Sequence, residues 1–83
     1  MEKNKEILLS LTSIFRIVFD DKNIKLDKNT SAHDIEEWDS LNQIKIILAC
    51  EKKFSVRLNP REVNGFENIG DMVNHLVSIG AKT

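Results

Sequence analysis

The spacing of apolar residues in the first quarter of the chain limits its fold more than any other feature of the sequence. Apolar side chains recur every three or four residues, which is the repeat of one face of an α-helix and not the alternation of a strand. These residues are Ile7, Leu8, Leu11, Ile14, Phe15 and Val18. The pattern predicts a helix over residues 4–19.

A second helix is predicted over residues 40–54, with Asp39 as its N-cap, because a carboxylate can accept hydrogen bonds from the first backbone N–H groups. Its expected apolar stripe consists of Leu41, Ile44, Ile47, Leu48 and Phe54, with Ala49 and Cys50 near the edge.

A short helix is predicted after Asn59, which can act as an N-cap before a proline, and Gly65 ends it within two turns. A last helix begins near Asn68 and ends at Gly80. Its expected buried face consists of Ile69, Met72, Val73, Leu76 and Ile79.

Residues 20–38 lack periodicity and form a long first loop, of a length that is uncommon unless the loop has a function. Ile24, Leu26 and Ile35 are expected to hold this loop against the core. With 83 residues, the chain is long enough for one domain only, spanning residues 1–83. The predicted fold is all-α: a four-helix bundle with three main helices, one short helix and the long first loop.

Charge and composition exclude several classes of partner. Twelve basic and 13 acidic residues give a formal net charge of −1, which provides no general attraction for nucleic acid or an anionic membrane. No apolar run reaches the roughly 20 residues that span a bilayer, and the N-terminus does not resemble a secretory signal. Cys50 has no cysteine to pair with, so a cytoplasmic location is the simplest prediction. No apolar stripe is expected to remain outside the bundle, which predicts a monomer.

The segment Glu36-Glu37-Trp38-Asp39-Ser40-Leu41 contains the residues most indicative of function. It places the Ser40 hydroxyl in the first turn of the second predicted helix. Free backbone N–H groups and the positive end of the helix dipole favour a phosphate there. Leu41 is expected to reach into the bundle, and Trp38 to pack as a hydrophobic staple.

Asp39-Ser40-Leu41 resembles the attachment motif of the acyl carrier protein family. Glu51-Lys52-Lys53-Phe54-Ser55-Val56 and the order of the predicted helices are also similar, so the resemblance covers nearly the whole chain. It implies that a phosphopantetheinyl transferase attaches 4'-phosphopantetheine from coenzyme A to Ser40. The arm would hold an acyl or aminoacyl group as a thioester, and the protein would be a carrier and no enzyme.

The resemblance further implies that Asp39 and Leu41 present the motif. Loading enzymes and downstream transferases or synthases would contact the second helix and the segment before it. The residues expected at this surface are Glu36, Glu37, Asp39, Leu41, Asn42 and Lys45.

The second helix departs from the acidic pattern of many fatty-acid carriers. It carries Lys45, Lys52 and Lys53 against one acidic residue, Glu51, while Asp34, Glu36, Glu37 and Asp39 precede it. Surface charge governs encounter and partner choice. A dedicated carrier of a specialised biosynthetic pathway therefore fits better than a housekeeping carrier of fatty-acid synthesis.

Other interpretations remain open from the sequence. The chain could be an unmodified helical docking module with a carrier-like fold. A small DNA-binding domain is disfavoured by the charge balance, and a Ser-based hydrolase by the absence of a Gly-x-Ser-x-Gly turn. His33 and His75 lack partners at metal-ligand spacing, so no metal site is predicted. Cys50 is expected to be a small buried hydrophobic residue.

Overall fold

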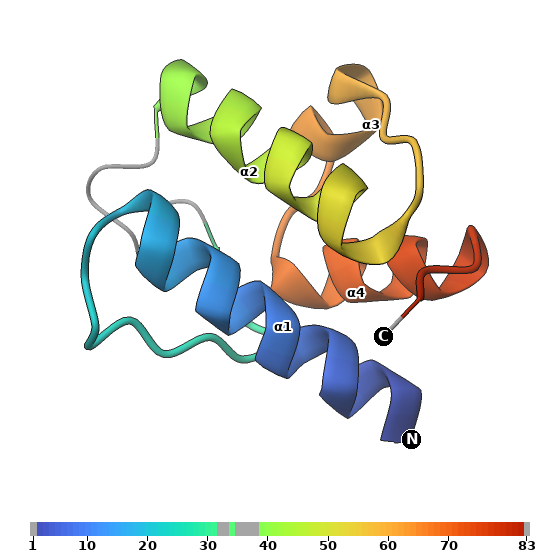
Figure 1. Cartoon of the computed structure of the whole chain (residues 1–83), viewed down its shortest axis with the longest axis horizontal. Coiled ribbons are helices and arrows are strands. Elements are labelled where there is room, and N and C mark those ends of the chain that lie inside the picture. The colour runs from blue at the N-terminus through green and yellow to red at the C-terminus, as the bar shows by residue number, and fades with distance from the viewer. Residues whose placement is uncertain (1, 32–33, 35–38, 83) are drawn as a thin grey trace.

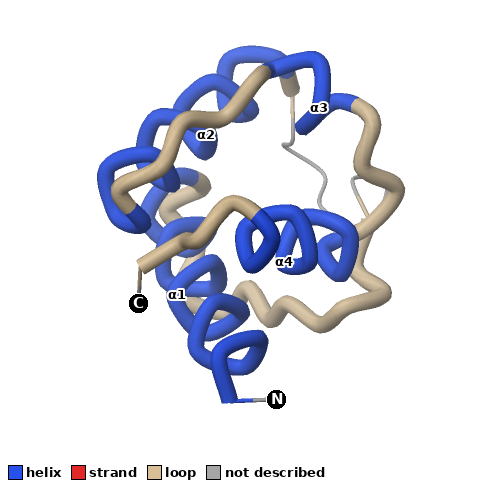
Figure 2. The backbone as a smooth tube through the Cα atoms, turned by 90° about the vertical axis from the view of Figure 1, so that its right-hand side faces the viewer, coloured by secondary structure: helices blue, strands red, loops and turns tan. Residues whose placement is uncertain are grey.

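The computed structural model describes residues 2–31, 34 and 39–82, except for the side chains of Glu2 and Ser40. It contains four helices in these ranges: α1 (Glu2–Val18), α2 (Ser40–Phe54), α3 (Pro60–Asn64) and α4 (Ile69–Ser78), with no strand among the described residues. Helix α1 packs against α2 and α4, while the short α3 packs against α2 (Figures 1 and 2). The predicted order of helices is confirmed, and the predicted first helix differs from α1 by two residues at its start and one at its end.

The core lies where the inner faces of α1, α2 and α4 meet. Phe15 and Phe54 are its largest fully buried side chains, contributed by α1 and α2. Around them lie the other buried apolar residues, namely Ile7, Leu11, Ile14, Phe19, Ile46, Ile47, Cys50, Leu58, Val63, Ile69, Met72, Val73, Leu76 and Ala81. The faces predicted for α1 and α4 supply half of this set.

The predicted apolar stripe of α2 is right for Ile47 and Phe54, which are buried, and wrong for Leu41, Ile44 and Leu48, which are exposed. Ile46 was left out of it but is fully buried, and Cys50 lies in the core and not at its edge. Leu41 and Leu48 were placed inside but are 62% and 60% exposed. The helix has apolar residues on more than one face, and packing against α1 selects the face that contains Ile46, Cys50 and Phe54.

Two further predictions about buried side chains are also wrong. Leu41 does not reach into the bundle, and Ile79 is 37% exposed because α4 ends just before it. The prediction of a monomer assumed that no apolar stripe would remain outside. That premise is wrong, because large apolar side chains on α1 and α2 are exposed: Leu9, Ile17, Leu41, Ile44 and Leu48.

The long first loop is held to the core by side chains and to α4 by its backbone. Ile24 and Leu26 are partly buried against the core, as predicted, while Ile35 lies outside the described residues. The N–H groups of Ile69 and Gly70 donate to the carbonyl oxygens of Thr30 and Lys28, at 2.8 and 2.9 Å. The loop thereby satisfies two of the free donors at the start of α4.

Side chains and turns cap the short and last helices as the sequence predicts. The side chains of Asn59 and Asn68 accept hydrogen bonds from the N–H groups of Arg61 and Asp71, both at 2.9 Å. Gly80 adopts a left-handed conformation (φ 79°) just after α4. This ending closes the last turn, because left-handed backbone returns the chain to the final carbonyl groups.

Candidate functional site

Asp39 defines the start of α2 by two hydrogen bonds. Its Oδ1 atom accepts from the N–H of Asn42 at 2.9 Å, and its carbonyl oxygen accepts from the N–H of Gln43, also at 2.9 Å. The predicted N-cap is therefore confirmed. Ser40 is the first residue of α2, so the cap fixes the backbone at the predicted attachment residue.

Several predicted features lie outside the described residues. These are Glu36 and Glu37 of the partner surface, the Trp38 staple, His33 and the side chain of Ser40. Asp34 is described and is exposed. Its carboxylate accepts a hydrogen bond from the N–H of Ser31 at 2.9 Å, which places one acidic group within the turn after Thr30.

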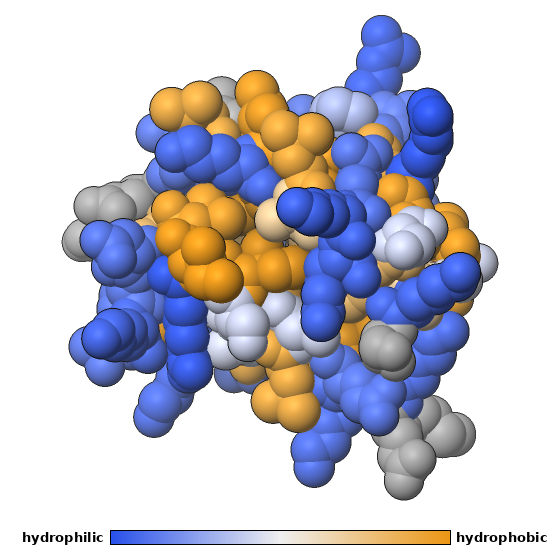
Figure 3. Space-filling model, in the orientation of Figure 1, coloured by the Kyte–Doolittle hydropathy of each residue, from blue (hydrophilic) through white to orange (hydrophobic). Residues whose placement is uncertain are grey.

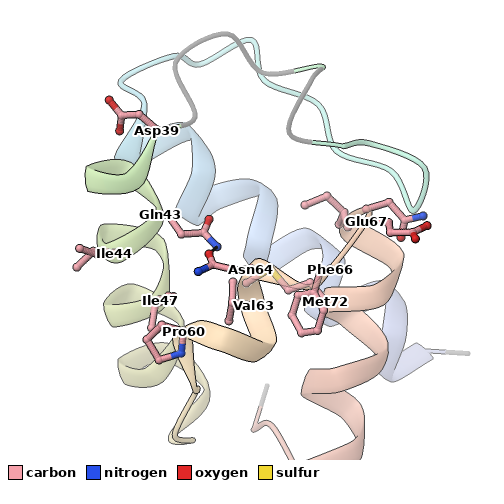
Figure 4. Close-up of a pocket in the computed structure, with 12 residues that line it drawn as sticks. Asp39, Gln43, Ile44, Ile47, Pro60, Val63, Asn64, Phe66, Glu67 and Met72 are labelled. Carbon is pink, nitrogen blue, oxygen red and sulfur yellow. Dashed lines mark hydrogen bonds between the residues drawn. The ribbon is translucent and has the colours of Figure 1, made fainter.

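A pocket of about 510 Å³ opens beside the start of α2. It lies between α2, α3 and the beginning of α4, and Figure 4 shows Val63, Phe66 and Met72 close together on its inner side. Its lining comprises Asp39, Gln43, Ile44, Ile47, Pro60, Val63, Asn64, Phe66, Glu67, Asn68, Ile69 and Met72. The residues at its depth are apolar and those at its mouth are polar, which is the usual character of a small-molecule site.

Helix α3 forms one wall of this pocket, and side-chain contacts join it to α2 on one side and to α4 on the other. Its Asn64 side chain accepts a hydrogen bond from Nε2 of Gln43 at 3.3 Å, and the two amides face each other in Figure 4. On the other side, Oε2 of Glu62 lies 3.2 Å from Nε2 of His75. The centres of the His75 and Phe66 rings are 5.4 Å apart. These contacts join residues 9 to 21 positions apart, so no local pattern in the sequence predicts them.

His75 was expected at the edge of the last helix, and it is partly buried there. Its partner is a single carboxylate, which is one ligand and not a metal set. Among the described residues, no group of three or more His, Cys, Asp or Glu side chains comes together.

The outer face of α2 carries exposed apolar residues between lysines. Leu41, Ile44 and Leu48 are more than half exposed, and Lys45 is exposed among them. Asn42 lies partly buried on another side of the helix. Figure 3 shows hydrophobic side chains gathered over α2 and the neighbouring part of α1 on the face seen in Figure 1. Leu41 and Lys45 of the predicted partner surface are therefore accessible to another protein.

Cys50 does not take part in this site. Its side chain is fully buried, and that burial, with a smaller effect of Glu51, raises the pKa of the thiol from 9.0 to about 12. A thiol with such a pKa stays protonated at neutral pH and is a poor nucleophile. The interpretation of Cys50 as a buried hydrophobic residue fits this environment.

The geometry can accommodate a linear group that begins at Ser40. Asp39 lies on the rim of the pocket and is the residue before Ser40, so an arm that starts at Ser40 starts beside the opening. An apolar depth behind a polar mouth suits a chain with a polar stem and an apolar end. The residues present therefore fit a phosphopantetheine arm bearing an acyl group.

Comparison with known proteins identifies the family. The model of the phosphopantetheine attachment site family matches residues 11–76. An acyl carrier protein from Renibacterium salmoninarum is 31% identical over 98% of this chain and all of the relative. One from Acidothermus cellulolyticus is 30% identical over 89% of this chain and 88% of the relative.

A solved structure agrees with this assignment. The solution structure of holo acyl carrier protein from Geobacter metallireducens superimposes with a TM-score of 0.79 at 38% identity, covering 87% of this chain and 83% of that one. This chain belongs to the acyl carrier protein family. It is a carrier with a phosphopantetheine prosthetic group and not an enzyme, and it works with a transferase and with loading and synthase enzymes. Within the described residues, no helix combines the length and hydropathy needed to cross a membrane.

Proposed function

We propose that Ser40 is the residue that carries the phosphopantetheine arm. The observation that carries this proposal is the position of Ser40 at the first residue of α2, next to the cap residue Asp39 on the pocket rim. A phosphodiester there lies at the positive end of the helix dipole, where negative charge is stabilised. In this arrangement Asp39 fixes the turn that presents Ser40 to the transferase.

The pocket between α2, α3 and α4 would shelter the end of the cargo nearest the arm. Ile47, Val63 and Met72 provide buried apolar contact at its depth, whereas Gln43 and Asn64 provide amides at its mouth. This combination supports an acyl or aminoacyl thioester whose polar stem stays near the mouth. The cargo is enclosed only in part, so a partner enzyme can withdraw it.

Partner enzymes would meet the protein near the arm. The proposed contact residues are Glu36, Glu37, Asp39, Leu41, Asn42 and Lys45. The transferase, a loading enzyme and a downstream transferase or synthase would use this surface in turn. The lysines of α2 support a dedicated carrier of a specialised biosynthetic pathway. We further propose that it acts in the cytoplasm as a single domain of residues 1–83.

Intact-mass measurement tests the attachment residue directly. The purified protein is incubated with coenzyme A and a broad-specificity phosphopantetheinyl transferase, in parallel with Ser40→Ala and Ser13→Ala. Ser13 is exposed on α1 and provides a matched serine control. Gain of one arm by the wild type and Ser13→Ala, but not by Ser40→Ala, is the expected result.

The folded state of each sample is checked by circular dichroism before the reaction. Gain of the arm by folded Ser40→Ala would assign the attachment to another residue. Absence of gain by any folded sample would favour the alternative function, a docking module that acts without modification.

A further inference from the structure

We infer that His75 is a positioning residue for the cargo: through Glu62 it holds α3 against α4 and keeps this wall of the pocket in place. The side chains of Glu62, Phe66 and His75 form the contact and are called here the α3 latch. The inference rests on the proposed function in one respect, because it requires the cargo to lie in the pocket behind α3.

Helix α3 depends on its neighbours for its position. It has five residues, Pro60–Asn64, and its one buried side chain is Val63. A helix of this length is not stable by itself in water, since forming the first turn is unfavourable and few hydrogen bonds follow. Contacts with α2 and α4 therefore decide where α3 lies.

His75 is the fixed partner in the contact with α4. Helix α4 is anchored in the core by Ile69, Met72 and Leu76, which are at most 2% exposed. The His75 side chain is 20% exposed, whereas that of Glu62 is 52% exposed. Because Nε2 of His75 lies 3.2 Å from Oε2 of Glu62, the buried core of α4 holds the exposed side of α3 through this pair.

The same histidine also contacts the lining of the pocket. Its ring centre lies 5.4 Å from that of Phe66, with 51° between the ring planes, and Phe66 lines the pocket together with Val63. The N–H of Phe66 donates to the carbonyl oxygen of Val63 at 3.2 Å, which joins Phe66 to the end of α3. One side chain of α4 thus holds the wall of the pocket at two points.

The charged groups near His75 come from α3, from α4 and from the segment between them. On α3, the Glu62 carboxylate faces Nε2, and Arg61 is exposed next to it in sequence. On α4, Asp71 lies one turn before His75, and its carboxylate accepts a hydrogen bond from the N–H of Glu67 at 3.0 Å. Glu67 is exposed on the pocket rim. Among the described residues, Glu62 is the one carboxylate in ion-pair contact with His75.

The strength of the latch depends on pH. The contact is an ion pair only when His75 is protonated. Histidine side chains change their charge between about pH 5 and pH 8, whereas glutamate stays ionised over that range. The ion pair is therefore present at the acidic end of the range and is lost as the pH rises. The contact of α3 with α2, between the amides of Gln43 and Asn64, contains no titrating group and does not change.

Hydrogen exchange of the apo protein tests the latch without the arm. The N–H groups of Val63, Gly65 and Phe66 donate to carbonyl oxygens within and just before α3, so their protection factors report its opening. At about pH 5.5, Glu62→Gln should lower these factors about twofold to fivefold, the effect of a partly exposed ion pair. Arg61→Gln changes an exposed charge on the same helix, does not line the pocket and should leave them unchanged.

The pH profile separates the latch from a merely structural role of Glu62. The wild-type protection factors of α3 should fall by the same twofold to fivefold between about pH 5.5 and about pH 8, because the ion pair is lost over this range. Those of Glu62→Gln should stay constant. Equal factors in the wild type and Glu62→Gln at the acidic pH, or a wild-type profile as flat as that of the variant, would overturn the inference.

Cleavage of a loaded thioester tests the effect on the cargo. The transferase delivers a butanoyl arm from butanoyl coenzyme A, and hydroxylamine then attacks the thioester carbonyl. The C–S bond breaks as a C–N bond forms, which releases a hydroxamate and leaves the thiol on the arm, as intact mass shows. Rates are divided by that of free butanoyl-pantetheine at the same pH. At about pH 5.5, Glu62→Gln should be cleaved about twofold to fivefold faster than the wild type or Arg61→Gln, because its pocket wall opens more often.

The two measurements separate this inference from the proposed function. Lower protection factors without faster cleavage would overturn the positioning role, because the cargo would then not lie behind α3. If intact mass shows that Ser40 takes no arm, the proposed function fails and the role in holding cargo fails with it. Hydrogen exchange of the apo protein still decides in that case whether His75 holds α3.

Discussion

The N–H of Gly70 donates to the carbonyl oxygen of Lys28 at 2.9 Å, and a Cβ atom on Gly70 would stand 2.9 Å from that same oxygen. Only a residue without a side chain allows the two backbones to approach this closely. The neighbouring bond from Ile69 to Thr30 completes the junction between the first loop and α4. The junction holds the start of α4, and with it the pocket residues Ile69 and Met72.

Gly70→Ala should destabilise the protein through this junction. The added methyl group forces the loop away from α4, at about 1–3 kcal/mol for an overpacked contact. The higher helix propensity of alanine offsets up to about 1 kcal/mol of this loss of stability. We therefore expect a net loss of stability of between zero and about 3 kcal/mol in urea unfolding.

Gly65→Ala is the matched control for this change. Gly65 has a φ of −83°, which alanine adopts readily, and its added Cβ would lie 3.4 Å from the nearest atom. Its effect should lie between zero and about 1 kcal/mol of added stability, because alanine restricts the unfolded chain. Equal losses at the two glycines would contradict the role given to the Lys28 contact.

Truncation of two nearby residues of α2 should distinguish the buried face of this helix from its exposed face. Ile46→Ala removes a fully buried side chain and should lower the free energy of unfolding by about 2–5 kcal/mol. Leu48→Ala removes a side chain that is 60% exposed and should change it by no more than about 0.5 kcal/mol. Chemical denaturation of both variants measures the difference. Similar losses of unfolding free energy in the two variants would indicate that Leu48 is buried in the core.

Cys50 should make stability fall in alkaline solution. The unfolded thiol titrates near its ordinary pKa of 9.0, whereas burial raises the folded pKa to about 12. Between these values the unfolded chain has released a proton that the folded chain still binds, so rising pH favours unfolding. The contribution is present in full below pH 9 and is lost progressively as the pH rises toward 12.

The variant Cys50→Ala isolates this effect from other titrating groups. It should be less stable than the wild type at neutral pH, because it leaves a cavity in the core. Its stability should nevertheless decline less steeply between pH 9 and pH 11, as measured by urea unfolding across that range. Parallel declines in the two proteins would show that the Cys50 thiol does not control the alkaline loss.

Cargo on the arm should be detectable from inside the pocket. When the holo protein carries an octanoyl group, methyl resonances of Val63 and Met72 should shift relative to the unloaded holo protein. The methyl groups of Leu9 provide the control, because Leu9 is 60% exposed on α1 and does not line the pocket. Shifts at Leu9 without shifts at Val63 and Met72 would place the cargo outside the pocket.

Much of the fold follows from local rules that act along the chain. The spacing of apolar residues in α1 and the cap residues Asp39, Asn59 and Asn68 depend only on neighbours in sequence. The structure confirms the positions of all four helices and the capping by all three side chains. The start of α2, where the attachment residue is proposed, was therefore predictable.

The phase of α2 was not predictable by the same rules. Apolar residues occupy positions 41, 44, 46, 47 and 48, so both a stripe through Leu48 and one through Ile46 satisfy helical spacing. The choice depends on α1, which packs on the side that contains Ile46 and Cys50. The Gly70 contact with Lys28 likewise joins segments 42 positions apart, and no local pattern reports it.

Helix α3 is a single turn whose one buried side chain is Val63, and this limits the work of moving it. Exposing a valine to water requires about 1.5–3 kcal/mol, and each methylene transferred out of water returns about 0.8 kcal/mol. Two to four methylenes of cargo could therefore compensate for displacing this wall of the pocket. Shorter or more polar cargo would leave α3 in place. The position of α3 would therefore depend on the length of the chain that the carrier holds.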